Sequence, residues 1–199
     1  FLTINNNWSG LLIDGDQDNI AYIKSDPIYW RYNIKALRAF ITKDNINNLL
    51  KENGISGEIG ILSIDIDGND YWVWDAMDIV SPAIVIIEYN ARFGSEISVT
   101  VPYDCDFDRA KKHHSMIYFG ASLRALCSLA SKKGYAFVGC CSAGVNTFFV
   151  RRDQMVKEIK ELTVKDGYVR NQHRESRNKN GELIYLNKEE EYEILMSLP

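Results

Sequence analysis

Tyr135-Ala-Phe-Val-Gly-Cys-Cys-Ser-Ala-Gly-Val-Asn-Thr-Phe-Phe-Val-Arg-Arg152 is the stretch that decides the fold. Two apolar, strand-like runs, residues 135–141 and 145–152, flank the turn at 142–144. A crossover between parallel strands needs a dozen or more residues, so a three-residue turn must join these strands as an antiparallel hairpin. The hairpin follows a series in which strands and helices alternate. We therefore predict an α/β fold with a sheet that is mostly parallel and ends in an antiparallel β-hairpin.

Apolar periodicity and capping residues predict the earlier elements. Strands are expected within the runs 8–16, 34–41, 60–70 and 83–90, and helices within 17–25, 42–53, 71–79 and 121–133. Asp16, Thr42 and Ser122 are the expected N-caps, and Gly54 is an expected helix stop. The stretch 91–120 has no clean periodicity, and its length indicates a functional lid. We expect one α/β domain over residues 1–152 and a charged, helix-rich appendix over 153–199 that packs on it.

Composition and charge argue against two classes of function, nucleic-acid binding and spanning a membrane. The chain has 199 residues, 46% of them hydrophobic, which is enough for one real core. Its net charge of −4 argues against nucleic acid as a partner, and no apolar run is long enough to span a bilayer. The four cysteines lack metal-finger spacing, which favours reduced thiols in a cytoplasm. They are Cys105, Cys127, Cys140 and Cys141.

Two apolar runs end in acidic and polar residues. The first ends in Asp65 and Asp67, and the second in Glu88 and Asn90. The carboxyl ends of neighbouring strands form the ligand crevice of an open α/β sheet, so we expect these side chains to converge there. Such oxygen donors suit a divalent cation, ribose hydroxyls or a proton acceptor. The alternative is that the acids only cap the helices that follow, which accounts for one acid per strand end.

The paired acids need compensation. Asp65 and Asp67 alternate with isoleucines, so on a strand they face the same side and repel each other. A Mg²⁺-type ion bridging Asp67, Glu88 and Asn90 would offset the charge. Hydrogen bonds to a cofactor and to loop backbone would do so without a metal. The sequence leaves both alternatives open.

Asp14 follows the first strand-like run. In nucleoside-binding α/β folds an acid in this type of position accepts hydrogen bonds from two ribose hydroxyls. The competing interpretation is a helix cap, for which Asp16 is better placed.

Two groups of residues in the sequence are candidates for a proton acceptor. Asp70 follows the acidic strand end, and His113 and His114 lie in the aperiodic stretch, where the imidazoles either face solvent or accept a proton. A charged cluster near the carboxyl terminus is either a solvated face or a clamp for a phosphate or sugar acid. Its residues are Arg174, Glu175 and Arg177.

Several motifs together resemble the FkbM-like S-adenosylmethionine-dependent methyltransferases. The resemblance is closest to a bacterial branch associated with surface polysaccharides and their phosphoramidate or sugar decorations. It covers nearly the whole chain. The runs that carry it are residues 8–16, 62–72, 85–90, 118–123, 142–146 and 174–177.

The resemblance implies a class I methyltransferase fold, which has a Rossmann-like sheet. It implies an O-methyltransferase for a sugar or phosphoramidate acceptor in capsule or O-antigen biosynthesis. Residues 67–71 are also similar to a segment of metal-dependent sugar O-methyltransferases, although Glu88 and Asn90 replace that family's adjacent acid pair. The FkbM-like resemblance also implies which residues bind the cofactor. It places Asp14 at the ribose, with Gly15 and Asp16 beside it, Ala39 and Phe40 at the adenine, and Asp65 at the methionine end.

One family feature is absent from the sequence. The glycine-rich loop of these enzymes, and the strand before it, do not precede Trp8. In the family this strand lies between the strands that contain Leu11 and Ile61 here, so we predict an upstream strand and helix. The rival functions are a non-catalytic nucleotide- or sugar-binding module and an NAD-dependent enzyme, and the terminal hairpin argues against the latter. The oligomeric state stays open, a homo-oligomer included.

Overall fold

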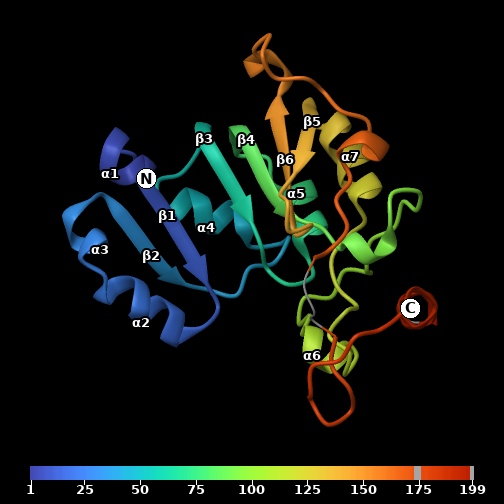
Figure 1. The fold of residues 1–199 in the computed structure, drawn as a ribbon. Helices are drawn as coiled ribbons and strands as arrows, with labels where there is room; N and C mark the ends of the chain where they lie inside the picture. Colours follow the sequence, from blue (N-terminus) through green and yellow to red (C-terminus); the bar gives the residue numbers. More distant parts are fainter. Residues whose placement is uncertain (173–175, 198–199) are drawn as a thin grey trace.

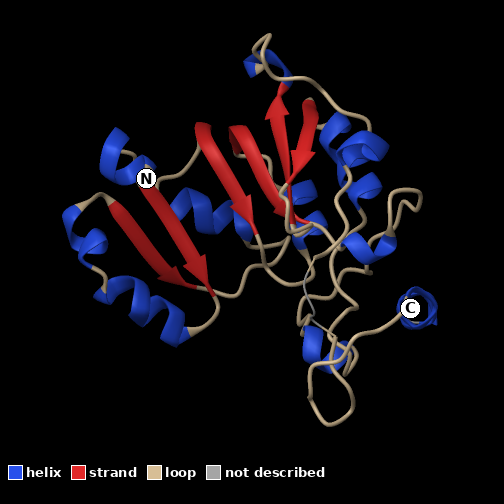
Figure 2. Cartoon of the chain, viewed as in Figure 1, coloured by secondary structure: helices blue, strands red, loops and turns tan. Residues whose placement is uncertain are grey.

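The computed structural model describes residues 1–172 and 176–197 of the chain (Figure 1). In these residues the strands form two sheets, with the orders β1-β2 and β3-β4-β6-β5. Figure 2 shows the two sheets as separate groups of arrows. The strands are β1 (Gly10–Asp14), β2 (Ile34–Arg38), β3 (Gly57–Ile64), β4 (Val80–Glu88), β5 (Tyr135–Cys140) and β6 (Asn146–Arg151).

Strand directions confirm the predicted α/β class. β1 pairs with β2 in parallel, and β3 pairs with β4 in parallel. β6 runs antiparallel to both β4 and β5, so the terminal hairpin forms as the short turn requires. Gly144, at a φ of 72° in that turn, adopts a conformation that favours glycine.

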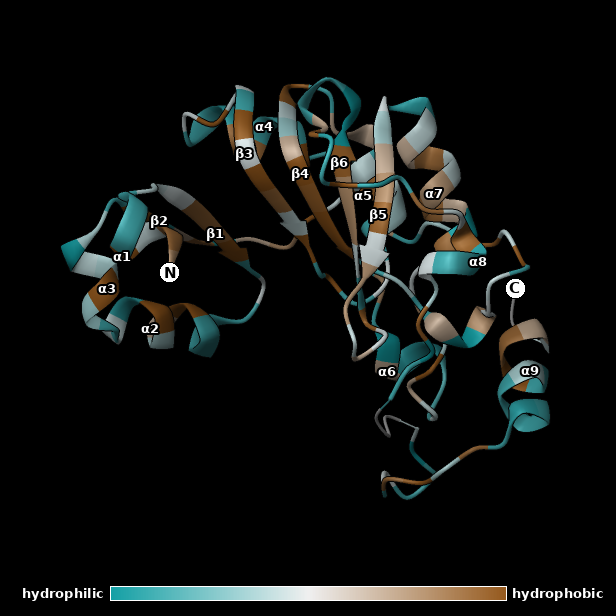
Figure 3. Ribbon diagram, turned by 45° about the horizontal axis from the view of Figure 1, so that its top comes forward, coloured by the Kyte–Doolittle hydropathy of each residue, from teal (hydrophilic) through white to brown (hydrophobic). Residues whose placement is uncertain are grey.

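Apolar helix faces build the core against the four-stranded sheet. Helices α4 (Ile46–Glu52), α5 (Asp70–Ala76) and α7 (Leu123–Lys132) contribute buried residues to one cluster with β4 and β6. Figure 3 shows hydrophobic colour along β3 and β4 in the same layer. Ser122 caps α7 by accepting a hydrogen bond from the Ala125 amide, as the sequence predicts.

The β1–β2 sheet has little core of its own. It is accompanied by α1 (Leu2–Asn6), α2 (Gln17–Ser25) and α3 (Pro27–Arg31). Among the described residues before Ile46, Ile20 is the only apolar side chain that is fully buried. Large apolar side chains on this part of the chain stay exposed instead. They include Trp8, Leu12, Tyr22, Trp30 and Phe40.

Thr42 exchanges hydrogen bonds with Asn45 in the reciprocal pattern of a capping box, and its carbonyl accepts from the Ile46 amide (3.1 Å), where α4 begins. Two predicted strand ends are wrong. β2 ends at Arg38 rather than at Ile41. β3 ends at Ile64, so Asp65 and Asp67 lie in the turn after the strand and not on it. Gly54 does end α4 with a φ of 78°.

The carboxyl-terminal residues run across the loop after β4. The Tyr168 hydroxyl donates to the Ala91 carbonyl (2.7 Å), and Arg92 forms an ion pair with Glu191 (3.2 Å). After β6 the described residues contain one 3-10 helix, η2 (Arg152–Gln154), and two α-helices, α8 (Val164–Gly167) and α9 (Lys188–Ser197). Among the described residues, no helix has the length and apolar character needed to cross a bilayer.

Candidate functional site

A cavity of about 380 Å³ opens where β1, β2 and β3 end. Its walls come from the end of β1 and the loops that follow the three strands, together with Asn19 of α2 and Phe107 of the long loop. The six residues that the family resemblance assigns to a cofactor all line this cavity, and so does Asp67. The six are Asp14, Gly15, Asp16, Ala39, Phe40 and Asp65.

Asp14 is held by the turn that it begins. One carboxylate oxygen accepts a hydrogen bond from the Asp16 amide (2.7 Å), and the other accepts one from the Asn19 side chain (3.0 Å). Asp16 caps α2 by accepting from the Asp18 amide, as predicted. Each carboxylate oxygen has a second lone pair, so Asp14 remains able to accept further hydrogen bonds from a ligand. The cap is therefore Asp16, and Asp14 is fixed in orientation at the cavity wall.

The turn after β3 is organised by Asp70. Its two carboxylate oxygens accept hydrogen bonds from the amides of Ile66 and Gly68, both at 3.0 Å. Burial raises the pKa of this carboxyl to about 6, against the lowering effect of those amides. Asp70 is fully buried and lines neither the 380 Å³ cavity nor a second cavity that adjoins it. Its contacts are those of a residue that shapes the turn.

Asp67 sits at the exposed crest of the same turn with a φ of 60°, a left-handed conformation that aspartate tolerates. Its carboxylate is 68% exposed and accepts a hydrogen bond from the Arg109 guanidinium at 3.0 Å. Asn69, in contrast, is buried and donates to the Asp104 carbonyl (2.7 Å). The turn is thus tied to the long loop at two points.

Glu88 ends β4 beneath this turn. It is only 6% exposed, and its Oε2 has no hydrogen-bond partner among the described residues. Burial, followed by the negative charges of Asp70 and Asp65, raises the pKa of this carboxyl to about 9. An isolated buried carboxylate is costly, so the side chain holds a proton at neutral pH.

Asn90 supports the long loop. Its side-chain amide donates to the carbonyls of Ile117 (2.8 Å) and Phe119 (3.1 Å), and its oxygen accepts from the Arg92 amide (3.1 Å). The side chain is 1% exposed. The amide therefore satisfies buried backbone groups, which is a common task of buried polar residues.

A second cavity of about 540 Å³ adjoins the first. The two share Phe40, Ile66, Asp67 and Phe107 in their walls. The rest of the second cavity comes mainly from the long loop around α6 (Arg109–Lys112). It brings both charge signs to the wall, with Asp106 and Asp108 beside Arg109 and Lys111.

Arg109 joins the two cavities' common wall to the long loop. Its guanidinium lies 3.7 Å from the centroid of the Phe119 ring, donates to the Met116 carbonyl and pairs with Asp67. Sequence reasoning missed Arg109, as well as Asn19 and Phe107. These residues lie in a helix turn or an aperiodic loop, and no spacing in the sequence places them at a strand end.

The histidine pair contacts its own loop. His113 Nδ1 is 2.6 Å from the Ser115 hydroxyl, and its ring centroid is 4.1 Å from that of His114. Burial, helped by His114, lowers the pKa of His113. Neither histidine lines the two cavities described above.

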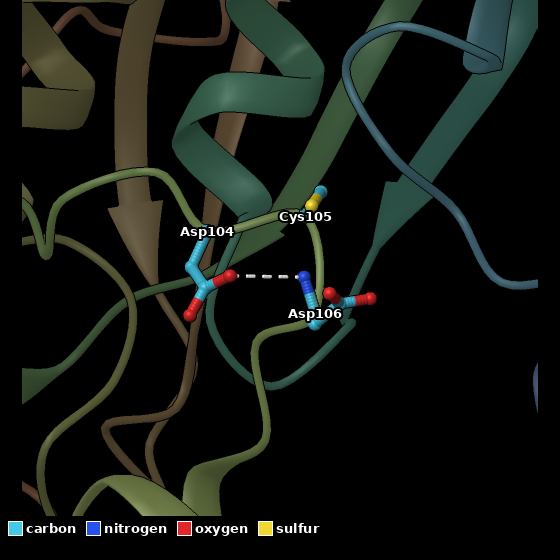
Figure 4. A group of neighbouring side chains, drawn as sticks. All are labelled: Asp104, Cys105 and Asp106. Atoms are coloured by element: carbon cyan, nitrogen blue, oxygen red, sulfur yellow. Dashed lines mark hydrogen bonds between the residues drawn. The ribbon is translucent and has the colours of Figure 1, made fainter.

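Three neighbouring side chains of the long loop bring potential metal-binding atoms within 4.8 Å of one another: Asp104, Cys105 and Asp106. Figure 4 shows the Asp104 carboxylate accepting a hydrogen bond from the Asp106 backbone nitrogen. The second oxygen of Asp104 pairs with Lys112 at 2.8 Å. Asp104 is therefore already engaged by the protein through both oxygens.

The predicted carboxyl-terminal charge cluster is only partly described. Arg174 and Glu175 lie outside the described residues, and Arg177 is exposed and donates to the Gly181 carbonyl (2.7 Å). No family model and no curated protein matches this chain. The cavities and the side chains around them are therefore the basis for a function.

Proposed function

We propose that this protein is an S-adenosylmethionine-dependent O-methyltransferase for a sugar or phosphoramidate acceptor of bacterial surface glycan biosynthesis. The observation that supports it is the convergence of six residues, predicted for the cofactor from three separate segments, on one 380 Å³ cavity. The order β2-β1, then β3-β4-β6-β5, with a terminal antiparallel hairpin, is also compatible with the class I methyltransferase sheet.

Within this proposal, each group of lining residues binds one part of the cofactor. Asp14 accepts the two ribose hydroxyls through the free lone pairs of its anchored carboxylate. Ala39 and Phe40 flank the adenine ring, and Asp65 faces the ammonium group of the methionine end. The cofactor, when bound, supplies a methyl group activated on a positively charged sulfur.

The acceptor belongs in the 540 Å³ cavity, because it shares a wall with the first and carries both charge signs. Asp67 lines both cavities, so it is placed to accept the proton of the acceptor hydroxyl, and Arg109 orients it at 3.0 Å. We prefer Asp67 to Asp70 and to the histidines, since those side chains line neither cavity.

The predicted metal set of Asp67, Glu88 and Asn90 does not fit a divalent cation as a group. The Asn90 side-chain amide donates to two loop carbonyls, and Asp67 is paired with Arg109 on the exposed side of the turn. Glu88 alone offers an unpartnered oxygen. Bound Mg²⁺ requires several oxygen ligands in near-ideal octahedral geometry. The proposed reaction therefore uses no step through a metal.

Isothermal titration calorimetry on the purified protein tests the proposal. We expect heat with S-adenosylmethionine and none with NAD. Asp14→Asn should weaken binding about 10- to 100-fold, because a hydrogen bond to a charged group is worth about 1.5–3 kcal/mol. Asp18→Asn is the matched control, since Asp18 lies outside the cavity in the first turn of α2, and it should change binding less than about twofold.

Transfer of a labelled methyl group to a panel of nucleotide-linked sugars then separates an enzyme from a binding module. Heat with NAD alone, or equal losses in both variants, contradicts the cofactor assignment. Binding of S-adenosylmethionine without transfer to any acceptor in the panel contradicts the catalytic part and favours the non-catalytic module.

A further inference from the structure

We propose that the 540 Å³ cavity binds a sugar that carries no negative charge, and that Asp106 selects against phosphorylated and other anionic acceptors. This inference rests on the proposed function, because it takes this cavity as the acceptor site, and it narrows the acceptor to an uncharged sugar. Two features of the cavity wall support it: the pairing of its charges and its aromatic side chains.

The three basic side chains of the segment 104–112 each form an ion pair with an acid. The distances between the paired nitrogen and oxygen atoms are 2.8 to 3.0 Å. The pairs are Arg109 with Asp67, Lys111 with Asp108, and Lys112 with Asp104. A phosphate or carboxylate that enters the cavity would therefore meet cations that acids already neutralise.

Asp106 is the remaining acid of this segment. Its side chain is exposed and lines the cavity, and within the part of the chain that the structure describes its carboxylate forms no ion pair. The Asp106 backbone amide donates to the Asp104 carboxylate at 3.0 Å, and Figure 4 shows the Asp106 carboxylate pointing away from Asp104. The wall thus presents a negative charge that repels anions and accepts hydrogen bonds from sugar hydroxyls.

Two phenylalanines give the same wall an apolar surface. Phe40 is 56% exposed. Phe107 packs on the turn after β3, where a Cβ at position 68 would collide with its ring, so Gly68 leaves the space that the ring occupies. One face of a sugar ring consists of C–H groups, which pack on aromatic rings, while its hydroxyls need polar partners.

The cavity is also large enough for a sugar. Its volume of about 540 Å³ falls within the roughly 300–1,000 Å³ that is usual for small-molecule sites. A phosphoramidate ion is smaller, has no apolar face for Phe40, and would be repelled by Asp106. Of the two acceptor classes in the proposed function, the sugar therefore matches the lining better.

NMR titration of the purified protein with matched ligands tests the selection by charge. The probes are phosphoramidate and four sugars, each beside its 6-phosphate: glucose, galactose, mannose and N-acetylglucosamine. We expect at least one neutral sugar to bind about 10-fold more tightly than its phosphate, because a like charge in a partly exposed site weakens binding by about that factor. Added salt should narrow the difference, since it screens the repulsion.

Asp106→Asn keeps the shape of the side chain and removes its charge. This variant should bind the neutral sugar about 3- to 10-fold more weakly, because hydrogen bonds to a charged acceptor are lost, and should bind sugar and phosphate within about threefold of each other. Asp75→Asn is the matched control, since Asp75 is exposed on α5 and lines neither cavity. The control should leave both affinities within about twofold of the unsubstituted values.

Three outcomes overturn the proposal. They are tighter binding of phosphoramidate or a sugar phosphate than of every neutral sugar, binding of no sugar with or without S-adenosylmethionine, and an unchanged preference in Asp106→Asn. The titration with S-adenosylmethionine reports separately on the proposed function. Selective binding of a neutral sugar without heat from S-adenosylmethionine supports the charge selection and contradicts the methyltransferase, whereas heat from S-adenosylmethionine with a preference for phosphates does the reverse.

Discussion

Replacing Glu88 by glutamine should change how the stability of the protein depends on pH. The carboxyl is 6% exposed, and burial and neighbouring acids raise its pKa from 4.5 to about 9. The folded pKa lies above the unfolded one, so the native state holds an extra proton between these values. The stabilisation is complete below pH 4.5 and is lost as the pH rises towards 9.

The expected effect is large. At pH 7 the solution is 2.5 units above the unfolded pKa of 4.5, and each unit corresponds to about 1.36 kcal/mol, so roughly 3 kcal/mol has been lost relative to acid. Glutamine mimics the protonated form and does not titrate. Its extra donor lowers stability by about 1–3 kcal/mol at every pH. The slope of stability against pH, rather than its absolute value, therefore reports on Glu88.

Urea denaturation from pH 5 to pH 9 measures this slope. We expect the unsubstituted protein to lose stability relative to Glu88→Gln as the pH rises. Glu96→Gln is the control, because the Glu96 side chain is 76% exposed and pairs with Arg124 at 3.5 Å. The stability of Glu96→Gln should therefore depend on pH in the same way as that of the unsubstituted protein. Parallel profiles for Glu88→Gln and the unsubstituted protein would refute the reasoning, since the native carboxyl would then be ionised throughout.

Two further predictions concern the long loop. Asn90→Ala should lower the free energy of unfolding by about 1–3 kcal/mol, because it leaves the buried carbonyls of Ile117 and Phe119 without their donor; urea denaturation checks this, and an unchanged midpoint contradicts it. If the proposed methyl transfer is observed, the double substitution His113→Ala and His114→Ala should leave its rate within about threefold of the unsubstituted rate, since neither ring lines the two cavities. A rate loss above about 100-fold would return a proton-transfer role to the pair.

Local signals predicted much of the fold. The short turn at 142–144 determined the hairpin, and Asp16 and Ser122 determined where α2 and α7 begin. Local signals failed where a turn begins inside a run that alternates like a strand. Asp65 and Asp67 alternate with isoleucines, but β3 ends at Ile64 and the Asp70 carboxylate holds the amides of Ile66 and Gly68 in a turn.

The candidate site also contains residues that the sequence indicates and residues that it does not. The carboxylates of Asp14 and Asp65 could be placed at strand ends from the sequence, because apolar runs end at acidic residues there, whereas Ala39 and Phe40 came only from the family resemblance. The protonation state of Glu88 could not be predicted, because its burial depends on what covers β4. Asn90 was an equally good candidate in the sequence, and only the position of residues 117–119 shows that its amide supports a loop.

Asp67 and Phe40 border both cavities, so a molecule that moves either side chain when it binds in one cavity also reshapes the other. Thermodynamic linkage would make the resulting change in affinity mutual. A partition made of two side chains is thus the place where occupation of one cavity is felt in the other.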